Sequence, residues 1–349
     1  MTNIKQIKIG NIMSQAITTF DEIREILKKA PKGCNDSAFA KQEREDQLTK
    51  PQGALGDLED YTKWIAKWQG RTGISLARPR VAVFAGNHGV AKQGVSLFPA
   101  EVTQQMVLNF QHGGAAVNQL CKTYDAELRI YEMNLEQPTK DFTSEPAMSE
   151  AECINAICYG MTSVEEGIDI LCVGEMGIAN TTSGSAIAHA LFGGEASDWV
   201  SPGTGVSGEA LTNKIRVVQE GVAKHKSAMI DGLEILRHLG GFELCAIIGA
   251  IIAARMGRVP VIIDGYTTTS AASILYAIDK NLLDHCMVGH LSAEPSHARL
   301  LDVIGKKAMV NFNMRLGEGT GAVIALGILK GAVACHNDMA TFAEAGVSG

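Results

Sequence analysis

Short aliphatic runs recur along this chain, and most of them lead into glycines and then into a segment with helical spacing. The runs are apolar throughout rather than alternating, which is typical of strands buried on both faces of a parallel sheet. Five such runs predict strands, at Val81–Ala85, Leu128–Tyr131, Ile168–Val173, Val259–Ile263 and Met287–Leu291. We therefore expect an α/β protein with a mostly parallel sheet and helices on both faces, in which ligands bind beyond the carboxyl ends of the strands.

The first 75 or so residues differ from the rest, because they are polar and helix-like. Apolar positions repeat with helical spacing in Asp21–Lys29 and Leu55–Trp68, and the apolar run Ala322–Leu329 predicts a helix near the other end. We expect the helices of the two chain ends to pack together. Residues 1–75 with about 322–349 would then form a small helical domain, and residues 76–321 a large α/β domain.

The composition excludes several classes of protein. The 349 residues carry a formal net charge of −7 without a cluster of Lys and Arg, so no nucleic-acid partner is expected. The segment Met1–Gln6 lacks the apolar core of a signal peptide, and the longest apolar stretches, Leu244–Met256 and Ala322–Leu329, are shorter than a bilayer-spanning helix. The eight cysteines form no CxxC pair and the nine histidines no HExxH motif. We predict a cytoplasmic protein with reduced thiols, no metal site and no membrane partner.

A single carboxylate lies among glycines near the end of the chain. In the segment Arg315–Gly321, Glu318 stands between Gly317 and Gly319, just before the predicted helix. Glycine lets a backbone come close to a ligand, and an isolated acid held there could act as a general base. The alternative interpretation is an ordinary solvated helix cap.

A second glycine turn, Gly174–Thr182, follows a predicted strand and precedes a helix of small residues. Free N–H groups at the start of that helix, together with Asn180 and Thr181, could cradle a phosphate, although the same residues are also good helix caps. Glu175 would repel a phosphate, and it suits sugar hydroxyls or a cation better.

A third turn, Pro202–Gly208, contains Gly203, Thr204 and Gly205. Its glycines match the dinucleotide pattern G-x-G-x-x-G, but the preceding segment is a poor strand and no acidic residue ends a second strand about 20 positions later. An anion-binding nest completed by Lys214 fits the pattern better. Taken alone, that lysine could equally be a solvated helix residue.

Three further features accompany these turns. Asn87 and His88 follow the clearest strand, where a histidine either takes part in chemistry or satisfies buried polar groups. Asp264, at another strand end, could bind ribose hydroxyls or cap the next segment. Phe98 and Met106 share one face of a predicted helix, which either packs in the core or forms a slot for a flat aromatic ligand.

Together these features predict an enzyme that binds a phosphorylated sugar and a flat base. In order along the chain they also resemble one family closely, the nicotinate-nucleotide–dimethylbenzimidazole phosphoribosyltransferases of cobalamin biosynthesis. The segments that carry the resemblance are Lys50–Gly56, Phe84–Val90, Gly94–Ser96, Gly113–Ala116, Gly174–Thr182, Gly203–Gly205 with Lys214, Asp264–Gly265 and Arg315–Gly321.

The resemblance implies transfer of phosphoribose from nicotinate mononucleotide to a benzimidazole, without a cofactor, by a homodimer built on a Rossmann-like sheet with a small helical domain. It implies that Glu318 takes the N–H proton of the benzimidazole while the other ring nitrogen attacks the anomeric carbon. The residues implied for phosphoribose and nicotinate are Glu175, Gly177, Asn180, Thr181, Gly203, Thr204, Gly205, Lys214, Asp264, Leu316, Gly317 and Gly319. Those implied for the benzimidazole are Asn87, His88, Phe98, Met106 and Met176.

Two positions depart from part of the family. Where some members offer polar side chains to the benzimidazole, this chain has Phe98 and Met106. The acceptor therefore stays open among dimethylbenzimidazole, another benzimidazole, adenine and a phenol. Two other functions also stay open: a nicotinamide-dinucleotide oxidoreductase, suggested by the glycine pattern, and a non-catalytic nucleotide-binding module.

Overall fold

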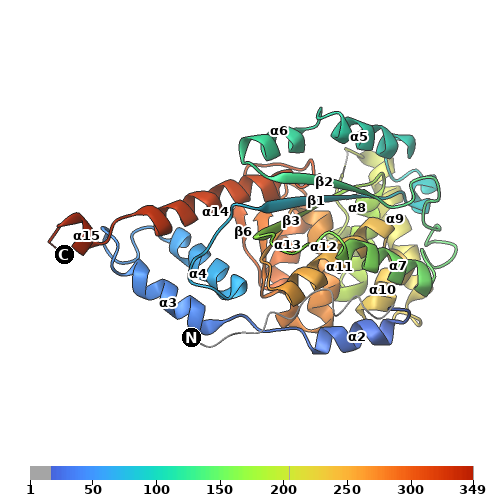
Figure 1. Cartoon of the computed structure of the whole chain (residues 1–349). Coiled ribbons are helices and arrows are strands. Elements are labelled where there is room, and N and C mark those ends of the chain that lie inside the picture. The colour runs from blue at the N-terminus through green and yellow to red at the C-terminus, as the bar shows by residue number, and fades with distance from the viewer. Residues whose placement is uncertain (1–16, 204, 349) are drawn as a thin grey trace.

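The computed structural model describes residues 17–203 and 205–348, and a six-stranded sheet lies at its centre (Figure 1). The strands are β1 Pro79–Ala85, β2 Glu127–Glu132, β3 Ile170–Met176, β4 Val261–Ile263, β5 Cys286–His290 and β6 Ala308–Val310. Their order is β2-β1-β3-β4-β5-β6, and all neighbours are parallel. The expected parallel, Rossmann-like sheet is confirmed, and all five predicted strands are present.

Two details of the sheet differ from the prediction. β3 continues through Gly174 and Glu175 to Met176, which pair with β1, so the start of the predicted turn is strand. The sequence analysis does not predict β6, because three residues at a sheet edge are too few to show a periodicity.

Helices connect the strands and cover both faces of the sheet. The α-helices are α2 Phe20–Lys28, α3 Asn35–Glu45, α4 Asp57–Gln69, α5 Glu101–Gln111, α6 Ala116–Thr123, α7 Glu150–Met161, α8 Asn180–Phe192, α9 Gly208–His225, α10 Gly232–Leu239, α11 Phe242–Gly257, α12 Tyr266–Ile278, α13 Pro295–Ile304, α14 Thr320–Asp338 and α15 Phe342–Ala345. Short 3-10 helices are η1 Gly89–Gln93, η2 Ala196–Asp198 and η3 Lys280–Leu283.

Alternate side chains of β1 enter two separate cores. Val81 and Val83 belong to a cluster with α14 and α6, whereas Ala82 and Phe84 belong to one with α7, α11 and α12. Successive side chains of a strand point to opposite faces of the sheet. Because both faces are covered, the strand is apolar throughout, which is the pattern that predicted it.

The helices of the two chain ends lie in two places (Figure 1). α3, α4, α15 and the end of α14 form a lobe that projects from the sheet, where Leu48 bridges to Thr341. α2 packs elsewhere: its Phe20, Ile23 and Leu27 belong to the core cluster of α7 and α11. The prediction groups α2 with the small unit, but its apolar face is buried on the large one. The division of the chain into two domains is otherwise still a prediction.

α14 extends well beyond the apolar run that predicted it. By length and composition alone this helix could cross a membrane, but more than half of its apolar stretch is buried inside the protein. Ala322, Leu326 and Leu329 pack in the same cluster as β1 and β3. α14 is therefore a core helix of the fold, and its first turn directly follows the Glu318 segment.

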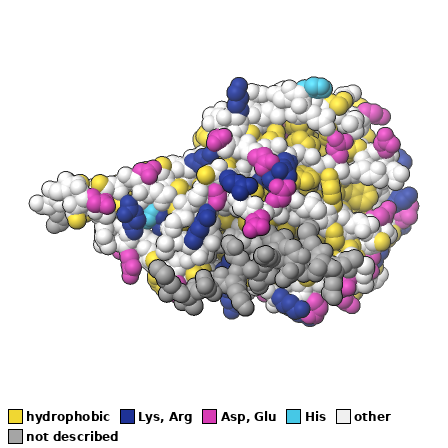
Figure 2. Space-filling view, viewed as in Figure 1, with side chains coloured by type: hydrophobic (Ala, Val, Ile, Leu, Met, Phe, Trp, Pro, Cys, Tyr) yellow, Lys and Arg dark blue, Asp and Glu magenta, His cyan; other side chains and the backbone are white. Residues whose placement is uncertain are grey.

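The visible surface carries mixed charge. Figure 2 shows Lys and Arg interspersed with Asp and Glu on this face, without a broad area of a single sign.

Candidate active site

Three carboxylates come together where β3 and β4 end. Glu175 is the penultimate residue of strand β3, Asp264 directly follows β4, and Glu318 lies just before α14. The Glu318 N–H donates to the Glu175 carbonyl oxygen at 3.2 Å. The Asp264 carboxylate accepts the N–H groups of Gly319 at 3.1 Å and Ala322 at 2.9 Å. The carboxyl edge of the parallel sheet thus assembles the predicted acids.

These contacts give Asp264 a structural role. Its side chain is fully enclosed, and both carboxylate oxygens accept backbone N–H groups from the segment that enters α14. The expected cap of the segment that follows Asp264 is not present, because the helix after it has no side-chain cap and the carboxylate instead accepts N–H groups at the start of α14. Binding of ribose hydroxyls by Asp264 stays a prediction.

The backbone at Glu318 is strained. Its φ is 61°, in the left-handed region that non-glycine residues seldom adopt, and the φ values of Gly317 and Gly319 are 80° and 78°. The segment also lies directly on β3, since a Cβ atom at Gly174 would come within 2.3 Å of the Gly319 nitrogen. Such strain persists only where surrounding contacts enforce it, and it is concentrated at functional sites.

Burial controls the charge of these acids. Glu318 is 5% exposed, and burial followed by the charge of Asp264 raises its pKa to about 7. The same two causes, in the same order, raise the pKa of Glu175 to about 8, against a hydrogen bond from the Asn180 amide. Desolvation therefore outweighs the helix N-terminus, which would favour the ionised acid. At neutral pH Glu318 is poised between acid and base, which suits proton transfer.

Lys214 is enclosed beside the third glycine turn. Its side chain is 1% exposed, and its Nζ donates to Thr181 Oγ1 and to the Ser201 carbonyl oxygen, both at 2.9 Å. Burial lowers the pKa of Lys214 to about 8. A Cβ atom at Gly203 would lie 3.1 Å from Nζ, so glycine lets the turn close over the amine. The interpretation as a solvated helix lysine is wrong.

The glycine turn is not a dinucleotide fingerprint. The segment before it contains η2, not a strand, and α9 begins at Gly208. Gly205 is exposed, and a Cβ atom there would lie 3.7 Å from Leu97. Thr204 lies outside the described residues.

Two residues that the sequence analysis does not assign complete this turn. Glu294 accepts the Gly203 N–H at 3.2 Å, and Arg315 donates to the Gly203 carbonyl oxygen at 3.0 Å. Arg315 lies in the Glu318 segment, which the sequence already marks as functional, so this arginine could have been predicted to belong to the site. Glu294 directly precedes α13 and has no local signal, because it is about 90 residues from the turn that it contacts.

His88 is enclosed within the protein. It is 2% exposed, with Nε2 2.6 Å from Glu243 Oε1 and Nδ1 2.9 Å from Ser183 Oγ. Both ring nitrogens have buried partners, which agrees with the alternative that the histidine satisfies buried polar groups. Its assignment to the benzimidazole pocket stays a prediction. Asn87 is also buried and donates to the Leu135 carbonyl oxygen at 3.0 Å.

The side chains predicted for the benzimidazole have unequal positions. α5 begins only at Glu101, so Phe98 precedes the helix, is 48% exposed, and does not share a helix face with Met106. Met106 and Met176 are half-buried and pack on the cluster that contains β1. Leu316, which lies within the Glu318 segment and was predicted for phosphoribose and nicotinate, is 57% exposed.

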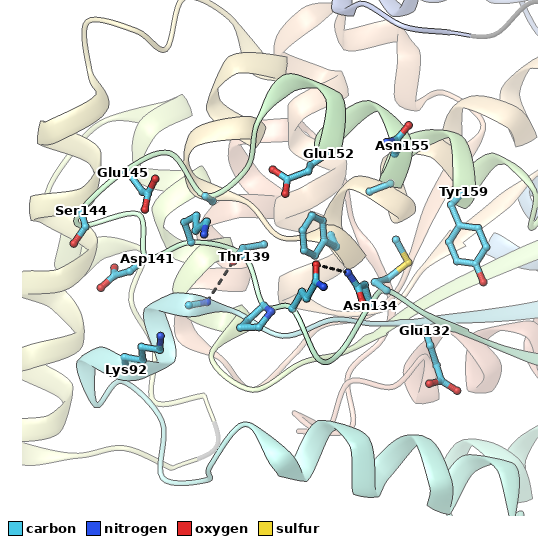
Figure 3. Close-up of a pocket in the computed structure, with 18 residues that line it drawn as sticks. Lys92, Glu132, Asn134, Thr139, Asp141, Ser144, Glu145, Glu152, Asn155 and Tyr159 are labelled. Carbon is cyan, nitrogen blue, oxygen red and sulfur yellow. Dashed lines mark hydrogen bonds between the residues drawn. The ribbon is translucent and has the colours of Figure 1, made fainter.

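A cleft of about 1110 Å³ lies apart from these residues (Figure 3). Its walls come from the end of β2, the segment 133–147 that follows it, η1 and α7. The side chains include Glu132, Asn134, Glu152 and Tyr159. None of the predicted site residues that the structure describes lines it. The candidate site therefore rests on convergent side chains at the sheet edge, not on cavity size. Within residues 17–203 and 205–348, no three His, Cys, Asp or Glu side chains are placed to hold a metal ion.

Comparisons with known proteins agree on one family. A family model described as Phosphoribosyltransferase matches residues 33–347. The chain is 53% identical over 336 residues to the nicotinate-nucleotide–dimethylbenzimidazole phosphoribosyltransferase of Rhizobium rhizogenes, and 52% identical over 336 residues to that of Sinorhizobium medicae. Each alignment covers 96% of this chain and 99% of the relative. The crystal structure of CobT from Thermus thermophilus matches with a TM-score of 0.83 and 37% identity, over 90% of this chain and 99% of that one. The chain therefore belongs to the nicotinate-nucleotide–dimethylbenzimidazole phosphoribosyltransferase family.

Proposed function

We propose that this protein is a pentosyltransferase that moves 5-phosphoribose from nicotinate mononucleotide to 5,6-dimethylbenzimidazole. The products are α-ribazole 5′-phosphate and nicotinate, in the synthesis of the nucleotide loop of cobalamin. The observation that carries the proposal is a buried acid in a strained glycine segment, Glu318, whose segment is tied through Arg315 to the glycine turn that encloses Lys214. The names of relatives that align over nearly the whole chain support these substrates.

The chemistry needs one base and no acid. The nicotinate ring nitrogen is positively charged in the donor, so it leaves with the electrons of the broken C–N bond as a neutral ring nitrogen. The attacking benzimidazole forms the new C–N bond and must lose its N–H proton, which Glu318 accepts. With a pKa raised to about 7, Glu318 is ionised often enough to act and basic enough to take the proton.

The donor phosphate has a binding place beside Lys214. The ammonium group, the Thr181 hydroxyl and the Gly203 turn lie together, and such a combination of cation, hydroxyl and backbone suits a phosphate. Glu175, whose side chain is partly exposed and carries a raised pKa, is positioned for ribose hydroxyls. Asn180 orients it by donating to its carboxylate.

The acceptor is proposed to be dimethylbenzimidazole because its flat ring and two methyl groups suit the apolar Phe98, Met106 and Met176. Another benzimidazole, adenine or a phenol would use the same reaction. Incubation with nicotinate mononucleotide and a panel of these bases, with mass detection of the nucleotides formed, ranks them. Wild-type protein that releases no nicotinate with any base would refute the proposed function.

The base assignment is tested by Glu318→Gln. We expect kcat to fall by about 10² to 10⁴, the usual contribution of a general base, while the Kd for nicotinate mononucleotide measured by calorimetry changes little. The matched control is Glu209→Gln, which removes an exposed acid from the start of another helix and should leave kcat unchanged. Unchanged turnover in Glu318→Gln would remove this residue from the role.

We further propose that the enzyme acts as a homodimer in the cytoplasm, as the family resemblance implies. Light scattering on the purified protein tests the assembly, for which we expect a mass twice that of one chain.

A further inference from the structure

His290, the last residue of β5, is buried behind the Glu318 segment and has no evident partner. It is 1% exposed, and neither ring nitrogen has a hydrogen-bond partner among the described residues. Its ring lies between two glycines: a Cβ atom would come within 2.8 Å of Nε2 at Gly265 and within 1.9 Å of Cδ2 at Gly321. Neither glycine has a left-handed φ, so the ring itself requires them. Buried polar side chains nearly always have partners, so this imidazole needs an explanation.

The nearest charge to the ring is the carboxylate of Asp264. Its Oδ1 lies 3.8 Å from His290 Nε2, beyond hydrogen-bond distance but within reach of an ion pair. A movement of about 0.8 Å would close this gap to a hydrogen bond. Asp264 in turn holds the N–H groups of Gly319 and Ala322, one on each side of the first turn of α14. An ionised carboxylate buried this deeply is costly without a positive charge beside it.

Within residues 17–203 and 205–348, the other titratable groups that interact with Asp264 are a thiol and two carboxyl groups, which cannot supply a positive charge. They are Cys172 and Glu175 on β3 and Glu318 before α14.

The second histidine nearby is neutral. His297 of α13 has its ring centroid 6.5 Å from that of His290, and its Nδ1 accepts the Ser292 N–H while Nε2 pairs with Thr269 Oγ1. Burial lowers the pKa of His297 to about 3. Of the two histidines, His290 is thus the one whose ring faces the Asp264 carboxylate without a hydrogen-bond partner among the described residues.

We propose that His290 is a positioning residue that supplies the positive charge for Asp264 and so holds the segment carrying Glu318. The positive ring lowers the pKa of Asp264, which burial raises, and the resulting negative charge raises the pKa of Glu318. Only the kinetic test of this inference depends on the proposed function, because the NMR test needs no enzymatic activity.

The first test needs no activity. In the ¹⁵N NMR spectrum of the wild-type protein, with His290 assigned by its loss in His290→Gln, we expect an imidazolium at pH 7. In Asp264→Asn the same ring should be less protonated at pH 7 than in the wild type, because an opposite charge nearby has been removed. A neutral ring at pH 7 in the wild type would overturn the proposal, whether or not Asp264→Asn folds.

The second test is a double-mutant cycle on the acid limb of the kcat profile. We expect His290→Gln to move this limb to lower pH, because a protonated Asp264 no longer raises the pKa of Glu318. In an Asp264→Asn background, which removes the same charge, His290→Gln should cause no further shift. Equal shifts in both backgrounds would show that His290 does not act through Asp264.

The matched control is His285→Gln. His285 is a buried histidine whose Nε2 pairs with the Ile251 carbonyl oxygen at 3.0 Å, away from the acids. This variant should lower stability at most and leave the acid limb in place; a shift as large as that of His290→Gln would overturn the proposal. A wild-type protein without transferase activity would refute the proposed function, while the NMR result would still decide the role of His290.

Discussion

At the scale of single residues, the site is a set of buried charges whose protonation depends on one another. Glu318, Glu175 and Asp264 lie at one sheet edge, and burial raises the pKa of each. Lys214 is shifted in the opposite direction by the same cause. Desolvation always disfavours the charged form, so acids and lysine move toward each other on the pH scale. A base and a cation can then function within one narrow pH range.

This arrangement predicts a bell-shaped pH profile. Glu318 works as the carboxylate, so kcat/KM should rise with pH through about 7 and at pH 6 be about sevenfold below its maximum. Lys214 works as the ammonium, so kcat/KM should fall as pH rises through about 8. Initial rates at low donor concentration, from about pH 5.5 to 9.5, measure both limbs. A flat profile over that range would contradict the roles of both Glu318 and Lys214. Residual activity of Glu318→Gln that no longer falls at low pH would support the role of Glu318 as the base.

At the scale of elements, strand β3 and the start of α14 are in direct backbone contact. Gly174 has no side chain because a Cβ atom there would lie 2.3 Å from the Gly319 nitrogen and 2.7 Å from the Glu318 carbonyl carbon. Neither backbone can yield without moving the strand or the catalytic segment. Because Gly174 has no Cβ atom, the Glu318 segment can lie directly against strand β3.

Gly174→Ala should thus separate the two elements. Overpacking of this kind costs about 1–3 kcal/mol of unfolding free energy, and displacement of Glu318 should lower kcat more than it raises the KM for the donor. Urea unfolding and steady-state kinetics measure the two effects. Gly73→Ala is the matched control, because a Cβ atom there meets nothing within 4 Å and its φ is not left-handed. Equal costs for the two variants would show that β3 and the segment are not in tight contact.

At the scale of the whole molecule, Trp68 of α4 is one of the contacts between the projecting lobe and the large unit, beside Ile65 and Ala66 of the same helix, which pack with β1. The ring is 1% exposed, the Arg255 guanidinium lies 4.2 Å from its centroid, and the His285 ring centroid lies 5.5 Å away. Two of the guanidinium nitrogens have no hydrogen-bond partner among the described residues, so the aromatic face is their main compensation. One side chain therefore joins the lobe to α11 and to the loop before β5.

Trp68→Ala should destabilise the protein by about 3–5 kcal/mol, since it removes a large buried side chain and exposes an unpaired guanidinium. Chemical denaturation measures the change, and Trp68→Phe, which keeps an aromatic face, should cost less. Phe39→Ala, on α3 of the same lobe, is the control: this side chain is 65% exposed and its loss should stay within about 0.5 kcal/mol. A loss below about 1 kcal/mol for Trp68→Ala would mean that the lobe is held by other contacts.

The amino-acid sequence by itself determined the sheet and the positions of the chemically active turns. Strands such as β1 are buried on both faces, so their apolar runs are visible without a structure. Turns that require glycine leave an equally local signal, which located Glu318, the Gly203 turn and Lys214. Short edge strands such as β6 leave none, because three residues show no period.

Only the tertiary structure decided which of these residues face a ligand and which support others. The enclosure of His88 by Glu243 and Ser183, the use of Asp264 as a cap for α14, and the contact of Glu294 with Gly203 all join residues more than 50 positions apart. Their pKa values depend on burial, which is a property of the packed chain and not of any segment. Local residue preferences therefore specify the elements and turns, whereas charge state and partnership arise only when distant segments exclude water together.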